Sequence, residues 1–112
     1  MKPLPNQLPP AISAYIKAVN VQAPERVAAC FHAEATVHDE GKARHGREQI
    51  EAWARETGTR YRSTIEPVGL DAADNAHALR ALVRGNFPGS PIQLSFHFLL
   101  RSGAIQSLEI RP

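Results

Sequence analysis

The spacing of apolar residues changes once along this chain, near Gly58, and that change limits the possible folds more than any other feature. Before it, apolar residues recur every three or four positions, which is the period of a helix with one buried face. After it, apolar and polar residues alternate, as they do in strands. Helices followed by strands with short turns predict an α+β domain, with three N-terminal helices packed on one face of an antiparallel sheet.

The first half of the chain predicts three helices. The first begins at Pro9 and Pro10, because the missing N–H of proline leaves no helical hydrogen bond unmade there. The second covers residues 24–31 and opens on another proline. The third covers residues 47–57, and Gly58 is suited to the left-handed residue that ends many helices.

The second half predicts strands joined by short polar turns. The first of them, residues 61–66, is interrupted by Pro67. Proline cannot donate a hydrogen bond to a neighbouring strand, so Pro67 predicts an edge strand or a bulge. Three further strands are expected at residues 79–87, 92–101 and 104–110.

The length of 112 residues is sufficient for one domain with a single core. We expect that domain to cover residues 9–112, after an extended arm of residues 1–8. A formal net charge of +2 is too small to indicate nucleic-acid binding, and no apolar run reaches the roughly 18 residues that a membrane span needs. Cys30 is the single cysteine, so no internal disulfide forms, and we expect a cytoplasmic protein.

Residues 35–41 predict one more strand, between the second and third helices, and it contains a candidate functional residue. Side chains alternate along a strand, so Val37 and Asp39 share one face while His38 and Glu40 share the other. If the Val37 face is buried, Asp39 is a carboxylate that points into an apolar interior. Such a group costs free energy unless it is paired, hydrogen-bonded or protonated. Asp39 is therefore either a base with a raised pKa or a cap for backbone N–H groups of the following turn.

Three segments of the chain resemble the SnoaL-like branch of the nuclear transport factor 2-like superfamily, which also contains ketosteroid isomerase. They are AYIKAVN at 14–20, VAACFHAEATVHDEG at 27–41 and GREQI at 46–50, and the closing hairpin continues the likeness. The resemblance implies a cone-shaped, cystatin-like barrel: helices closed against a curved sheet, with an apolar cavity between them. It is informative about fold and not about activity, because the superfamily holds isomerases, cyclases, hydrolases and non-catalytic binders.

The resemblance to ketosteroid isomerase implies roles for individual residues. Tyr15 falls on that enzyme's hydrogen-bonding tyrosine, and Asp39 falls on its general base. Phe96 stands where the isomerase has a second, protonated aspartate in its oxyanion hole. Losing one such donor typically costs about 3 kcal/mol of transition-state stabilisation, so we do not expect steroid isomerisation. Another acid–base reaction, or ligand binding without catalysis, fits the sequence.

The functional hypothesis pairs Asp39 with Tyr15 inside an apolar cavity that binds a small molecule. Tyr15 lies on the apolar face of the first helix, where it is either a core aromatic residue or a hydrogen-bond donor in the pocket. Trp53 is likewise either a core filler or part of a cavity wall. Four aromatic residues are expected to line the cavity: Trp53, Phe87, Phe96 and Phe98.

Other chemistry receives little support from the sequence. His38, Glu40 and His45 are a conceivable metal site, but their spacing matches no recognised ligand motif, so we expect neither a metal nor a cofactor. Cys30 lies among apolar residues and is expected to be a buried, unreactive thiol.

The outer face of the predicted sheet combines arginines with Leu82, His97 and Leu99. It is more apolar than a face wetted by solvent needs to be. Many proteins that this chain resembles form dimers through that face. We therefore expect a homodimer through the outer sheet face, with no nucleic-acid or membrane partner.

Overall fold

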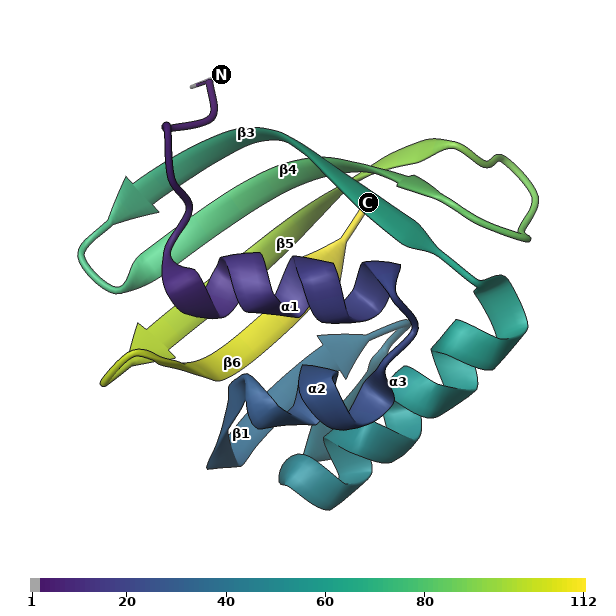
Figure 1. Ribbon diagram of the computed structural model, residues 1–112, viewed down its shortest axis with the longest axis horizontal. Coiled ribbons are helices and arrows are strands. Elements are labelled where there is room, and N and C mark those ends of the chain that lie inside the picture. The colour runs from purple at the N-terminus through teal and green to yellow at the C-terminus, as the bar shows by residue number, and fades with distance from the viewer. Residues whose placement is uncertain (1–2) are drawn as a thin grey trace.

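The computed structural model describes residues 3–112 and shows three helices packed on one six-stranded sheet (Figure 1). The helices are α1 (Pro10–Asn20), α2 (Pro24–Ala29) and α3 (Arg47–Tyr61). The strands are β1 (Phe31–Asp39), β2 (Lys42–His45), β3 (Thr64–Ala73), β4 (Ala76–Arg84), β5 (Ile92–Arg101) and β6 (Ala104–Arg111). Their order across the sheet is β2-β1-β6-β5-β4-β3. The start of the expected arm, residues 1–2, lies outside the described part of the chain.

Prolines begin the first two helices, as predicted, but two of the predicted helix ends are wrong. The second helix ends at Ala29, and Phe31 already belongs to β1. The third helix continues past Gly58 to Tyr61, and its left-handed cap is Arg62, with φ 47°. Gly58 serves close packing instead, because a Cβ on it would lie 3.0 Å from the Gln22 Oε1 atom.

The sheet is mixed, so the prediction of an antiparallel sheet is wrong. Strands β1 and β6 are parallel, whereas the other neighbouring strands are antiparallel. A parallel pair needs a long crossover connection. Here α3 and strands β3 to β5 supply it, because β1 pairs with the last strand of the chain and not with the next long one. In addition, β1 and β2 precede α3, so the helices do not all come before the strands.

Strand β2 was not predicted, because its polar sequence has no apolar alternation. It forms a tight hairpin with β1, in which Thr36 pairs with His45 and Asp39 pairs with Lys42. The connecting residues Glu40 and Gly41 have φ values of 53° and 75°. Two successive positive φ values are the conformation that matches the twist of a two-residue hairpin.

Pro67, which interrupts the alternation, predicted an edge strand or a bulge. It belongs to β3, which is an edge strand of the sheet. The pairing of β3 with β4 also shifts register between Pro67 and Gly69. Both predicted possibilities, an edge position and a bulge, are therefore confirmed.

The core lies between the helices and the inner face of the sheet. Figure 1 shows the strands bending around α1, with α2 and α3 together near β1. Apolar faces of α1, β1, α3 and the long strands meet in this layer. Several of its side chains have no exposed surface: Ile12, Phe31, Val37, Ile50, Leu79, Ile105 and Leu108. Among residues 3–112, no helix combines the length and apolar character required to cross a membrane.

Candidate functional site

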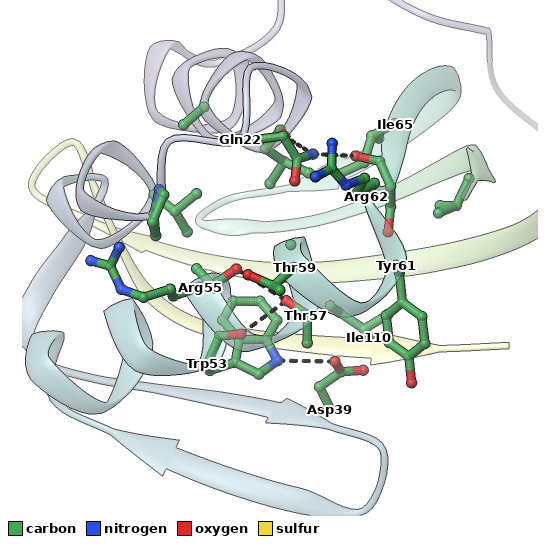
Figure 2. Close-up of a pocket in the computed structure, with 18 of the residues that line it drawn as sticks. Gln22, Asp39, Trp53, Arg55, Thr57, Thr59, Tyr61, Arg62, Ile65 and Ile110 are labelled. Atoms are coloured by element: carbon green, nitrogen blue, oxygen red, sulfur yellow. Dashed lines mark hydrogen bonds between the residues drawn. The ribbon is translucent and has the colours of Figure 1, made fainter. Parts of the chain in front are cut away.

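A cavity of about 610 Å³ opens between α1, α3 and the inner face of the sheet. Its size is in the range of small-molecule sites. Side chains from α1, α3 and strands β3 to β6 form most of its wall, and the end of β1 contributes Asp39. Figure 2 shows Asp39 at one end of the cavity and Gln22 and Arg62 at the other.

Asp39 is the last residue of β1 and is half-buried on the cavity wall. Val37, on the same face, is completely buried, so the predicted orientation of Asp39 is confirmed. Trp53 Nε1 donates a hydrogen bond to Asp39 Oδ2 at 3.0 Å (Figure 2). Burial raises the pKa of Asp39 above its ordinary value, and the charge of Glu40 raises it further. The Trp53 hydrogen bond, the charge of Arg44 and the Glu40 backbone N–H oppose that rise.

Tyr15 projects from α1 and also lines the cavity, with only 2% of its surface exposed. Its ring packs against Phe31 and Phe98, at centroid distances of 6.1 and 5.5 Å. The hydroxyl makes no hydrogen bond to any residue in the described part of the chain. Burial first, and the nearby Asp39 charge second, raise the pKa of Tyr15, so the phenol stays protonated and can donate a hydrogen bond.

Trp53, Phe87 and Phe96 line the cavity as predicted, but Phe98 does not. Phe98 shares the inward parity of Phe96, and the two rings stack at 6.4 Å. Helix α1 lies over this part of the sheet, and its Tyr15 ring packs edge-on against Phe98 at 5.5 Å. The parity of a strand shows which side chains point inward, but it does not show which of them a helix covers.

We call the end of the cavity that contains Asp39 and Glu40 its acidic end. Two residues there were assigned wrongly from the sequence. Glu40 was expected on the face opposite Asp39, yet it lines the same cavity, because the left-handed turn after β1 ends the alternation. Tyr61 was expected in a strand, but it is the last residue of α3. The Tyr61 hydroxyl donates a hydrogen bond to Glu40 Oε2 at 3.3 Å, and its ring meets Phe87 edge-on at 5.9 Å.

The conceivable metal ligands do not converge. Glu40 faces the cavity and accepts a hydrogen bond from Tyr61, while the His45 ring is bonded to Thr36 Oγ1 at 3.0 Å. Within residues 3–112, no three histidine, cysteine or acidic side chains are placed to hold a metal ion. Cys30 is half-buried and not enclosed, and its thiol donates to the Arg26 carbonyl at 3.3 Å.

Comparison with known proteins identifies the family. The model of the SnoaL-like domain matches residues 12–105, which is most of the chain. The chain belongs to the SnoaL-like domain family. Its fold is that of the ketosteroid isomerase-like and NTF2-like proteins, as the resemblance implied. No curated protein matches the sequence.

Solved structures agree with this SnoaL-like assignment. A candidate polyketide cyclase from Sinorhizobium meliloti is 30% identical, with a TM-score of 0.89 over 93% of this chain and 95% of that one. A protein with a ketosteroid isomerase-like fold from Catenulispora acidiphila, in complex with trimethylamine, is 21% identical, with a TM-score of 0.84 over 95% and 87%. An NTF2-like protein of unknown function from Cytophaga hutchinsonii is 18% identical, with a TM-score of 0.74 over 89% and 84%.

Phe96 gives the SnoaL-like cavity of this chain its apolar character beside Tyr15. The two ring centroids are 6.4 Å apart, and 3% of the Phe96 surface is exposed. A phenylalanine ring offers no hydrogen-bond donor. The Tyr15 hydroxyl therefore has an aromatic ring beside it, at Phe96, and no carboxylic acid at that position to act as a second hydrogen-bond donor.

Proposed function

We propose that this SnoaL-like protein binds an apolar small molecule in its cavity and acts on it by acid–base chemistry. Asp39 is the base and Tyr15 is the hydrogen-bond donor. The observation that carries this proposal is the half-buried Asp39 carboxylate, whose pKa burial raises, on the wall of an aromatic cavity. A raised pKa brings a carboxylate closer to the pKa of the carbon acid from which it takes a proton.

The geometry of Asp39 supports proton abstraction from a carbon next to a carbonyl. Trp53 holds Oδ2, which fixes the carboxylate and leaves Oδ1 to accept the proton. As the C–H bond breaks, negative charge develops on the carbonyl oxygen, and the Tyr15 hydroxyl can donate to it. An isomerase or a cyclase could use this step, whereas a hydrolase would use Asp39 to take a proton from the attacking water.

A single donor favours substrates whose carbanion is already stabilised. Because Phe96 supplies no second hydrogen bond, we propose a carbon acid that lies between two carbonyl groups. The 30% identical structure from Sinorhizobium meliloti, described as a candidate polyketide cyclase, supports a substrate of this kind.

A test of the catalytic role is the Asp39→Asn variant, because asparagine keeps an oxygen that can accept the Trp53 hydrogen bond. The measurement is deuterium exchange of 1,3-diketones by NMR, in the wild type and in the variant. We expect the variant to lose at least about a hundredfold in exchange rate, the usual size of a general-base contribution. Unchanged exchange in a folded variant would contradict the proposal.

The second candidate is a binding module without catalysis on the same scaffold. It is favoured by the Trp53–Asp39 hydrogen bond, because a carboxylate held in this way can be a structural part of the wall. This candidate predicts that Asp39→Asn leaves the binding of an apolar probe intact. It also predicts that neither the wild type nor the variant accelerates deuterium exchange of the 1,3-diketones.

We also propose that two copies pair through the outer sheet face. Leu99 lies there with 43% of its surface exposed, and Leu82 and His97 are half-buried on neighbouring strands. The cytoplasmic location remains a prediction from cysteine usage.

A further inference from the structure

The acidic end of the cavity is already occupied by the protein's own donors. Asp39 accepts the Trp53 indole N–H at 3.0 Å, and Glu40 accepts the Tyr61 hydroxyl at 3.3 Å. Each carboxylate therefore has a neutral hydrogen-bond donor from the protein.

The two basic residues of the cavity wall differ from each other. Arg55 is bound to Glu51, with 2.7 Å between Nη2 and Oε2. Arg62 also lines the cavity, and it is exposed. Its backbone N–H donates to the Gly58 carbonyl at 2.9 Å, but its side chain makes no hydrogen bond or ion pair with any residue between 3 and 112. The guanidinium of Arg62 is thus the one charged group of the described wall that the protein leaves without a partner.

The backbone at Arg62 is a second unusual feature. With φ 47° and ψ 47°, it holds the left-handed position after α3, which glycine or asparagine normally fills. A non-glycine residue in this region is strained, and in the described chain Arg62 shares this strain with Gln22, Glu40, Asp74 and Ser102. Figure 2 shows that this conformation places the Arg62 side chain beside Gln22, at the end of the cavity opposite Asp39.

We propose that Arg62 binds the carboxylate of an amphipathic ligand whose apolar body fills the cavity. The proposal rests on the proposed small-molecule function of the same cavity and names its ligand class as apolar carboxylic acids. A guanidinium offers two parallel N–H donors that match the two oxygens of a carboxylate. With its acid group at Arg62, the ligand extends along the aromatic wall toward Asp39 and Tyr15.

The test compares three probes of the same shape: 2-naphthoic acid, 2-naphthamide and the 2-naphthylmethylammonium ion. Their binding to the wild-type protein and to Arg62→Gln is measured by titration calorimetry at pH 7.5. We expect the wild type to bind the acid roughly tenfold more tightly than the amide, and Arg62→Gln to reduce that ratio to about twofold or less. Arg55→Gln is the matched control, since Arg55 lines the same cavity but is paired, and it should leave the ratio unchanged.

A second variant keeps the test independent of folding defects. Arg62→Gly removes the guanidinium and relieves the left-handed strain, so its Tm should equal or exceed that of the wild type while the preference for the acid disappears. Tightest binding of the ammonium probe, or an unchanged acid preference in Arg62→Gln, would overturn the inference about Arg62 and leave the cavity function standing. Failure of all three probes to bind would overturn both.

Discussion

Trp53 and Asp39 form the contact on which the proposed acid–base chemistry depends most. Because burial outweighs the hydrogen bond from Trp53, the pKa of Asp39 in the folded protein lies above its ordinary value of 3.8. Ionised Asp39 therefore reduces the stability of the fold at neutral pH. That loss is recovered as the pH falls through the raised pKa toward the ordinary one.

At the residue scale, Trp53→Phe should raise the pKa of Asp39 further. The substitution keeps an aromatic wall but removes the only side-chain donor to the carboxylate in residues 3–112, and that donor stabilises the charged form. NMR titration of the Asp39 carboxyl should show the rise, and the acid limb of kcat/KM should move to higher pH with it. Tyr61→Phe, which removes the bond to Glu40 instead, is the control. A lower pKa of Asp39 in Trp53→Phe would show that the indole does not stabilise the anion.

At the element scale, Asn20 joins the end of α1 to the edge strand β3. Its Nδ2 donates to the Ile65 carbonyl at 3.0 Å, and its Oδ1 accepts the Ile65 N–H at 2.7 Å. Asn20→Ala leaves both backbone groups of Ile65 without these partners, so we expect a loss of about 1–3 kcal/mol in the free energy of unfolding, measured with urea. Lys17→Ala, at an exposed position of the same helix, should change it by less than about 0.5 kcal/mol. Equal losses in the two variants would refute the role of this link.

Local chemistry predicted some elements well and others poorly. Pro10 and Pro24 mark helix starts, and the alternation of Val37 and Asp39 gave the correct face, because both signals act within a few residues. The parallel pairing of β1 with β6 could not be predicted in this way, since alternation is the same in either direction. The position of Glu40 on the cavity wall depends on the left-handed turn, and that of Tyr61 depends on where α3 ends.

At the scale of the whole molecule, the cavity results from how one sheet bends around α1. Side chains that are far apart in the sequence, such as Tyr15, Trp53 and Phe96, meet there because three elements converge. The inner face thus carries both the core and the cavity. The outer face of the long strands is not covered by the helices, and it carries the exposed side chain of Leu99.

Leu99→Lys should weaken the proposed dimer at the outer face. Lysine there replaces apolar contact with a pair of charges buried against each other across the two-fold axis, so we expect the dissociation constant to rise at least about tenfold. Sedimentation equilibrium over a range of protein concentrations measures it. Val21→Lys is the matched control, because Val21 is 56% exposed but follows α1, which packs on the inner face of the sheet. A wild-type protein that remains monomeric at millimolar concentration would exclude the dimer, and a dimer unaffected by Leu99→Lys would place its interface on another face.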